Sequence, residues 1–330
     1  MKPLDNSTIT AYRECPRKAY FRYVRHWTMD GPEPVYFTFG SAWHSGLDAL
    51  YKAYYEARSL QNTRSSAWNK ARQSDEFALA MSEVASQAFN QIWTDAGWPI
   101  DPDPDQYTAF KARTPTKARE MFFYYYKELA EHMNRWKLVQ TEKPFCVPLD
   151  PDKEIFYSGR IDKVIEDELG TIWLLEHKTS TLYSTTSGFR NDFIQDFSPN
   201  SQVEGYMYAI RFLQSQGELP DQNFGGVYVD ASLVHKTQFH FKRIPIYYDE
   251  MLVAEWLADV RYWHNAFTQS EETDSFPRST NNCFNKYSQC SYLHLCRTHP
   301  SIQKWAGSDD APEGFVESEW SPLASKEIPQ

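Results

Sequence analysis

The sequence predicts an α/β protein whose central mixed β-sheet, from about Lys143 to Phe267, is flanked by helices. Two observations lead to this class. Apolar residues recur at helical spacing through most of the first 140 residues. Beyond Lys143, short runs rich in aromatic and β-branched residues alternate with turn signals and further helical stretches. The composition, 41% apolar and 24% charged, is that of an ordinary globular protein.

The N-terminal region is expected to be largely helical. Ser7 is a candidate cap for a first helix that includes Cys15. The "DPDPD" stretch at 101–105 predicts a loop, because each proline disfavours a helical conformation in the residue before it. Further helices are expected over residues 39–57, 66–93 and 116–136.

Strand patterns dominate the next part of the chain, where "EDELG" predicts a tight turn between two strands. Strands are expected over residues 143–149, 155–165, 171–178, 224–230 and 237–246. Helices are expected over residues 202–214 and 250–267. We therefore divide the chain, within one compact domain, into an N-terminal helical region (1–140), a sheet-bearing core (141–268) and a C-terminal cysteine segment with its tail (269–330).

The charge balance and the absence of targeting signals limit the function classes. A net charge of −10 argues against general affinity for nucleic acid but leaves room for a local basic face. No run approaches the roughly 18 apolar residues of a membrane span, and Met1 to Thr10 lacks the apolar core of a secretion signal. A cytoplasmic protein with no membrane contact and with reduced cysteines is therefore expected. A G-x4-GK[ST] phosphate-binding loop is also absent, which excludes an ATP motor of that type.

Two carboxylates face each other across the hairpin predicted for "GRIDKVI" and "TIWLLEHK". A hairpin folded about Leu169 pairs residues whose numbers sum to 338, and Asp162 and Glu176 form such a pair. Their Cβ atoms are then roughly 5 Å apart on one face of the sheet. Facing carboxylates repel each other. A hard divalent cation between them turns that repulsion into binding, because Mg²⁺ and Mn²⁺ prefer carboxylate oxygens.

Strand alternation places Lys178 on the face of Glu176 and directs the His177 side chain to the opposite face. The His177 carbonyl remains available to a metal from the main chain. The Lys178 ammonium is suited to orient an attacking water and to stabilise charge on a phosphate. A surface salt bridge among Asp162, Glu176 and Lys178 would produce the same pattern, so the residues alone leave both interpretations open.

The same hairpin resembles a known family. "GRIDKV", followed fourteen residues after its aspartate by "EHKTS", resembles motifs II and III of the PD-(D/E)xK nucleases. The chain is most similar to the RecB-like branch, which includes the AddB nuclease domain and the nucleases of CRISPR spacer acquisition. Three more stretches agree with that branch, in its order: "ITAYRECPRKAYFRY", "FGSAWHSGL" and "QVEGYMYA". The resemblance implies a restriction-endonuclease-like fold with a large N-terminal helical region and a C-terminal cysteine-bearing segment.

The resemblance also implies roles for three helical residues. "FGSAWHSGL" is similar to the first motif, in which a helix presents a metal-binding histidine, here His44. "QVEGYMYA" is similar to the Q-x3-Y motif, here Gln202 and Tyr206. Four residues apart on one helix face, this pair is suited to reach a phosphate or to orient Lys178. Without the family, a lone helical histidine such as His44 is more often a packed core residue than a metal ligand, and ordinary helix packing is the alternative for the Gln202–Tyr206 pair.

Four cysteines form a one-plus-three pattern. Cys283, Cys290 and Cys296 lie within fourteen residues, and Cys15 lies near the other end of the chain. Such a set suits zinc or a 4Fe–4S cluster. In the RecB-like branch the arrangement implies a 4Fe–4S cluster, but the six residues between Cys283 and Cys290 depart from the usual two, which keeps zinc or no metal open. Cys146, in the apolar "FCV", is expected to be a core thiol.

A local basic strip is the candidate DNA contact, and its members are Arg13, Arg17, Lys18, Arg22 and Arg25. At helical spacing, three of them lie along one face, which suits a track for phosphates. A solvated helix face paired with acids elsewhere is the alternative. No segment resembles a reader of base edges, so binding to DNA without sequence specificity is expected.

These features predict a metal-dependent deoxyribonuclease. The residues expected to hold Mg²⁺ or Mn²⁺ are His44, Asp162, Glu176 and, through its carbonyl, His177. The remaining catalytic residues are Lys178, Gln202 and Tyr206. The expected activity is that of an exonuclease on DNA ends or single strands in recombination, repair or phage DNA processing, beside a helicase or a recombinase. The alternatives are a structure-directed or site-specific endonuclease on the same core, and a non-catalytic DNA-binding subunit with a structural metal site.

Overall fold

The computed structural model describes residues 4–101, 110–150, 155–284, 289–298, 310–321 and 323. The expected "DPDPD" loop lies almost entirely outside the described residues. The chain forms two compact units. The larger unit comprises Pro32–Lys143 and Ile161–Asp249, and the smaller unit comprises Met1–Gly31, Pro144–Arg160 and Glu250–Gln330. None of the described helices combines the length and the apolar character that a membrane crossing requires.

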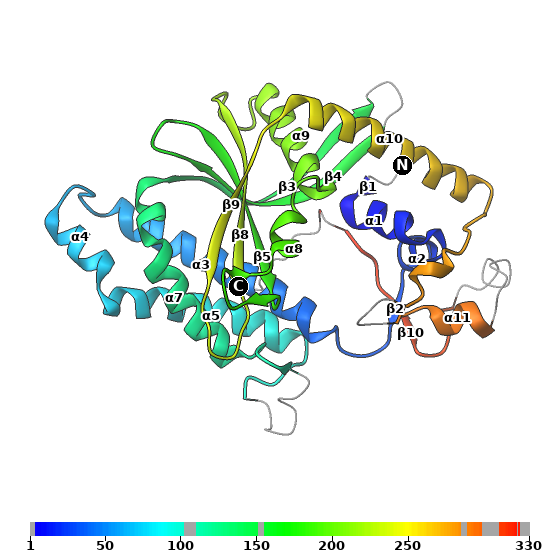
Figure 1. Cartoon of the computed structure of the whole chain (residues 1–330), viewed down its shortest axis with the longest axis horizontal. Coiled ribbons are helices and arrows are strands. Elements are labelled where there is room, and N and C mark those ends of the chain that lie inside the picture. The colour runs from blue at the N-terminus through cyan, green and yellow to red at the C-terminus, as the bar shows by residue number, and fades with distance from the viewer. Residues whose placement is uncertain are drawn as a thin grey trace. The chain divides into compact units, whose positions relative to one another are not determined.

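The helices of the larger unit largely follow the sequence patterns (Figure 1). They are α3 (Val35–Ser59), α4 (Ser66–Gln73), α5 (Asp75–Asp95), α7 (Pro115–Arg135), α8 (Asn191–Gln195) and α9 (Ser201–Ser215). The single helix predicted over residues 66–93 is wrong. Ser74 has an extended backbone (φ −73°, ψ 155°), and its hydroxyl accepts a hydrogen bond from Phe77 N. It therefore ends α4 and caps α5.

The central sheet is mixed, as predicted. Its strands are β1 (Leu4–Asp5), β3 (Lys137–Asp150), β4 (Ile155–Glu166), β5 (Ile172–Ser180), β8 (Phe224–Leu233) and β9 (Phe241–Tyr247). In the described chain their order is β1–β4–β5–β8–β9, with β3 also paired to β4. The neighbours β4–β5 and β8–β9 are antiparallel, whereas β5–β8 is parallel. Helix α9 supplies the long crossover that the parallel pair requires.

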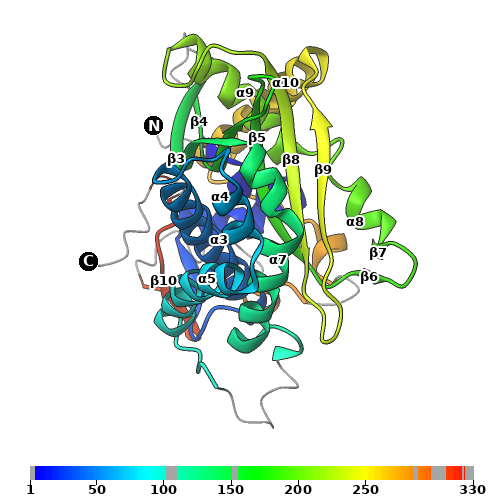
Figure 2. The ribbon, with the colours of Figure 1, turned by 90° about the vertical axis from the view of Figure 1, so that its left-hand side faces the viewer.

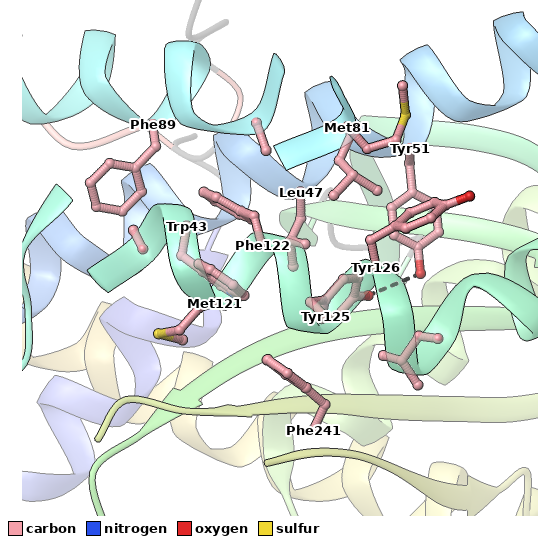
Figure 3. Close-up of a cluster of buried hydrophobic side chains, with 14 of the residues drawn as sticks. Trp43, Leu47, Tyr51, Met81, Phe89, Met121, Phe122, Tyr125, Tyr126 and Phe241 are labelled. Carbon is pink, nitrogen blue, oxygen red and sulfur yellow. Dashed lines mark hydrogen bonds between the residues drawn. The ribbon is translucent and has the colours of Figure 1, made fainter. Parts of the chain in front are cut away.

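The core of the larger unit lies between helices α3, α5 and α7 and one face of the sheet (Figures 2 and 3). Trp43 of α3 stacks on Phe122 of α7 with ring centroids 4.2 Å apart. From the sheet, Trp173 and Leu175 of β5 join the cluster. Because strand side chains alternate, the even-numbered residues of β5 project from the other face. Glu176 and Lys178 are therefore kept away from the helical core.

Between β5 and α9 the chain forms a small antiparallel hairpin of β6 (Tyr183–Ser184) and β7 (Gly188–Phe189). The Ser198–Pro199 peptide bond before α9 is cis. Two expectations here are wrong. Cys146 is exposed, because side chains of β3 alternate and Phe145 and Val147 take the buried positions. Strand β9 begins at Phe241, four residues later than predicted.

The smaller unit contains α1 (Asn6–Glu14), α2 (Pro16–Ala19), a π-helical turn (Tyr20–Val24), α10 (Glu250–Glu272), a 3₁₀ turn (Thr280–Asn282) and α11 (Leu293–Thr298). Strands β2 (Trp27–Met29) and β10 (Phe315–Glu317) pair antiparallel. The predicted cap Ser7 is wrong, because Asp5 caps α1 by accepting hydrogen bonds from Ser7 N and Thr8 N. Cys15 is extended, with φ −164°, so α1 ends before it and Pro16 starts α2.

Candidate active site

The end of the β4–β5 hairpin brings Asp162 to the main chain of β5. The strand pairs Lys163–Leu175 and Val164–Leu174 have residue numbers that sum to 338, so the predicted register is confirmed. At the next position Asp162 Oδ2 accepts a hydrogen bond of 2.8 Å from His177 N. The Asp162 carboxylate thus accepts a hydrogen bond from the main chain of β5 where the β4–β5 pairing ends. This bond fixes the Asp162 side chain beside Glu176, its neighbour in the register.

The face of β5 opposite the helical core carries Glu176 and Lys178, as strand alternation predicted. Lys178 Nζ donates to Glu176 Oε1 at 2.6 Å and to Gln202 Oε1, on α9, at 2.8 Å. Gln202 Nε2 in turn donates to Tyr206 OH at 3.0 Å. Asn200 caps α9 by accepting from Gln202 N, which fixes the start of the helix. The predicted Gln202–Tyr206 pair therefore lies against Lys178.

His44 reaches the same cluster from α3. Its Nδ1 lies 3.3 Å from Asp162 Oδ1 and 3.2 Å from Asp162 Oδ2. The His44 side chain keeps 29% of its surface exposed, unlike the fully buried Trp43 and Leu47 on the same helix. This histidine is therefore part of a polar cluster and not a packed core residue. Four residues from α3, β4 and β5 meet here: His44, Asp162, Glu176 and Lys178.

The members of the cluster shift one another's pKa. Burial raises the pKa of Glu176 to about 7, and the Asp162 carboxylate adds to the rise. Burial acts in the same direction on Asp162, but the charge and hydrogen bond of His44 outweigh it and hold the pKa of Asp162 well below its usual range. Burial opposes the charge of Lys178, but Glu176 outweighs this effect and raises the pKa of Lys178. At neutral pH, Lys178 is a hydrogen-bond donor and not a base.

The donor groups fit Mg²⁺ or Mn²⁺ by type, because carboxylate oxygens are the ligands these cations prefer. Glu176 is 2% exposed, and its Oε2 is buried without a hydrogen-bond partner in the described chain. That oxygen has a free ligand position. As the side chains stand, no group of three His, Cys, Asp or Glu among the described residues is arranged to hold a metal ion. The His44–Asp162 and Glu176–Lys178 contacts occupy the other donor atoms.

The chain also matches a known protein family over most of its length. Residues 6–297 match the model of the PD-(D/E)XK nuclease superfamily. The chain belongs to the PD-(D/E)XK nuclease superfamily. Its members generally use Mg²⁺ or Mn²⁺, and by family this chain is a nuclease. A search of curated proteins found no match.

Solved structures also resemble this PD-(D/E)XK nuclease. A crystal structure from Eubacterium rectale, described as a "Putative exonuclease", aligns with a TM-score of 0.48 and 10% identity over 93% of this chain and 94% of that chain. The crystal structure of SSO0001 aligns with a TM-score of 0.27 and 15% identity over 66% of this chain and 74% of that chain. The family assignment rests on the sequence match alone.

Sequence reasoning missed a second polar group in this PD-(D/E)XK nuclease, on the His177 face of the sheet. Its buried side chains are Lys163, His177, Asp230 and Arg243, together with the hydroxyls of Tyr51 and Tyr125. Burial, followed by the charge of Lys163, lowers the pKa of His177 to about 4. A signal existed for Lys163 and Asp230, since each is a charge within or at the end of an apolar strand run and must be paired.

The basic strip lies in the smaller unit, where each of its members already has a contact. Arg17 is buried, and its Nε donates to Phe276 O at 2.9 Å, so its guanidinium faces the interior. The π-helical turn also changes the spacing on which a single basic face was expected. The other contacts are Arg13 over Trp263, Lys18 with Glu14, Arg22 with Ser318 O and Arg25 over Trp27.

The four cysteines of the predicted cluster also lie in the smaller unit. Ser279 N donates to Cys15 Sγ at 3.4 Å, and Cys290 N donates to Cys283 O at 2.9 Å. Burial raises the pKa of Cys290 and of Cys296, and the charge of Cys15 contributes to both rises. Cys15 therefore lies within electrostatic reach of Cys290 and Cys296. Among the described residues the four thiols do not form a set arranged to hold a metal, so their ligation stays a prediction.

Proposed function

We propose that the chain is a divalent-metal-dependent deoxyribonuclease that acts as an exonuclease at DNA ends. The observation that carries this proposal is the meeting of His44, Asp162, Glu176 and Lys178 at the end of one hairpin in a member of a nuclease superfamily. The preference for ends rests on the resemblance of the motifs to the RecB-like branch. Recombination, repair or phage DNA processing is the setting that this branch implies.

His44, Asp162, Glu176 and the His177 carbonyl hold Mg²⁺ or Mn²⁺ in this proposal. A cation bound there would supply Lewis-acid chemistry, lowering the pKa of a water and withdrawing charge from the phosphate. Asp162 meets the requirement for an ionised ligand, since its pKa lies well below neutral. Glu176 contributes the buried oxygen that no hydrogen bond occupies.

Lys178 is the residue that acts on the reacting groups. Its ammonium donates a hydrogen bond to the attacking water or to a phosphate oxygen, which places the water and stabilises negative charge as it develops. Gln202 and Tyr206 act through Lys178. Because Gln202 Nε2 donates to Tyr206 OH, its amide oxygen is directed at Lys178 Nζ. This chain of contacts keeps the ammonium in one position.

The smaller unit supplies the remaining parts of the proposal. Arg13, Lys18, Arg22 and Arg25 are the candidates for contacts with phosphates, which carry most of the affinity in non-specific DNA binding. Cys15, Cys283, Cys290 and Cys296 are the candidates for a 4Fe–4S cluster. A helicase or recombinase is the kind of partner expected, since the sequence contains no phosphate-binding loop of an ATP motor.

The test compares linear duplex, covalently closed circular duplex, and linear and circular single-stranded DNA, each with Mg²⁺, with Mn²⁺ and with chelator. An exonuclease degrades the linear forms to short products and leaves the circles intact. Cleavage of the circles would replace the proposal with an endonuclease. Binding without cleavage of any form would replace it with a non-catalytic subunit. The control is Asp162→Asn, which keeps the size of the side chain and removes its charge, and it should be inactive.

A further inference from the structure

We infer that Lys163, His177 and Asp230 form a positioning network that holds the β5 main chain, and through it Asp162, in place for the metal. The inference rests on the proposed function, adds Lys163 and Asp230 to it, and gives the His177 side chain a role besides that of its carbonyl. None of them belongs to the cluster on the Glu176 face, and all three side chains lie on the opposite face of the sheet. Each is completely buried.

The network begins at the His177 peptide. His177 N donates to Asp162 Oδ2 at 2.8 Å, so the position of this peptide sets the position of the carboxylate. The His177 ring has a close contact at each nitrogen. Its Nε2 is hydrogen-bonded to Lys163 Nζ at 2.9 Å, and its Nδ1 lies 2.9 Å from Asp230 Oδ2, at ion-pair distance but outside hydrogen-bond geometry in the described chain. These two contacts restrict the ring and the peptide that carries it.

The neighbours of His177 also determine its tautomer. An ammonium has no acceptor, so Lys163 donates and Nε2 must accept. Nδ1 then carries the proton and faces the Asp230 carboxylate at 2.9 Å. The strand neighbours agree with this arrangement, because His177 and Asp230 are directly paired across the parallel β5–β8 ladder. The ring therefore has a hydrogen bond at Nε2 and an ion-pair contact at Nδ1.

Asp230 connects the network to the helical core. Tyr125 OH, on α7, donates to Asp230 Oδ2, and Arg243 Nε, on β9, donates to Asp230 Oδ1 at 3.2 Å. Arg243 Nη2 also donates to Tyr51 OH at 2.7 Å. Tyr51 and His44 lie on the same helix, α3, seven residues apart, which is about two turns. The core thus holds both the His44 helix and the His177 peptide.

Acidic groups surround the cations of the network. Arg243 Nε pairs with Asp230 Oδ1, and the nearby acids Asp162, Asp48, Glu142 and Asp230 oppose the burial that lowers the pKa of Lys163. Groups that orient metal ligands from behind typically matter for the metal itself. Their loss lowers metal affinity or activity about 10- to 100-fold. We expect this range for changes that release the His177 ring.

Two pairs of variants test the inference, with Mn²⁺ binding measured by calorimetry and folding measured by urea unfolding. His177→Asn keeps a donor near Asp230, and His177→Gln keeps an acceptor near Lys163, so each removes one anchor. Both should weaken Mn²⁺ binding about 10- to 100-fold. If both fail to fold, a gentler matched pair on α7 decides. Tyr125→Phe removes the hydroxyl that donates to Asp230, and Tyr126→Phe removes a buried hydroxyl that donates to Arg72 O.

The expected result is weaker Mn²⁺ binding in Tyr125→Phe than in Tyr126→Phe at similar loss of stability. Equal Mn²⁺ affinity in both tyrosine variants, or wild-type affinity in folded His177 variants, would overturn the network. Failure of the proposed function would be seen in the wild-type protein and not in the comparison of variants. In that case the wild-type protein itself neither binds Mn²⁺ nor cleaves DNA, whatever the variants do.

Discussion

Replacing glycine by alanine at two positions of α3 should change stability in opposite directions. Gly46 lies where α3 crosses α5 and α7. A Cβ at this position would lie 2.2 Å from Phe122 Cζ and 2.9 Å from the Ala85 carbonyl oxygen. At Gly40, on the same helix, a Cβ would have no other atom within 4 Å among the described residues. Both substitutions therefore add the same methyl group to the same helix, and they differ only in the space around that methyl group.

The magnitudes follow from that space. In an open helical position, alanine is favoured over glycine by up to about 1 kcal/mol. Gly40→Ala should gain an amount of this order. At position 46 the methyl group needs the Phe122 ring to move, but that ring is fully buried and stacked on Trp43. Overpacking of this kind costs about 1–3 kcal/mol, which exceeds the gain in helix propensity. Gly46→Ala should therefore be destabilised.

Urea unfolding followed by tryptophan fluorescence measures the difference, because Trp43 and Trp93 lie in the core that Gly46 helps to form. The free energy of unfolding should fall for Gly46→Ala and rise or stay level for Gly40→Ala. A Gly46→Ala protein as stable as Gly40→Ala would show that the contact between α3 and α7 adjusts freely. Rigid packing at this crossing would then not be what holds His44 in position.

Three further predictions concern catalysis, pH and the cysteines. Lys178→Met should lower kcat about 100- to 1,000-fold because an ammonium that stabilises developing charge is lost; wild-type turnover from the folded variant would contradict the mechanism. Burial lowers the pKa of His264, so the folded state resists a proton that the unfolded chain accepts. Stability should therefore be full above pH about 6.5 and fall below it by at most about 1.4 kcal/mol per pH unit. His264→Gln should reduce this slope in urea titrations, and an unchanged slope would exclude His264 as its source. Protein purified without oxygen should absorb visible light if an iron–sulfur cluster is present, and Cys290→Ser should abolish that absorbance while the exposed Cys146→Ser should not; colourless, iron-free wild-type protein would end the cluster hypothesis.

The sequence by itself determined the local geometry of the hairpin. The period of two along a strand and a short turn at "EDELG" leave one register that buries the apolar side chains, and the observed pairing sums to the predicted 338. The same alternation put Lys178 beside Glu176 and sent His177 to the other face. Long amphipathic helices such as α3 and α7 could also be predicted from the sequence, because the spacing of their apolar residues is a local property.

Only the tertiary structure decided which distant residues meet. The contact of His44 with Asp162 joins residues 118 positions apart, and the contact of Tyr125 with Asp230 joins residues 105 apart. Such contacts depend on how helices pack on the sheet, which no short-range pattern encodes. The break at Ser74 is local instead, because its hydroxyl caps α5 through Phe77 N, three residues on, and helical spacing alone did not reveal it. Arg17 again depends on a distant partner: its charge suggested a surface residue, but its guanidinium is buried and donates to Phe276 O, 259 positions away.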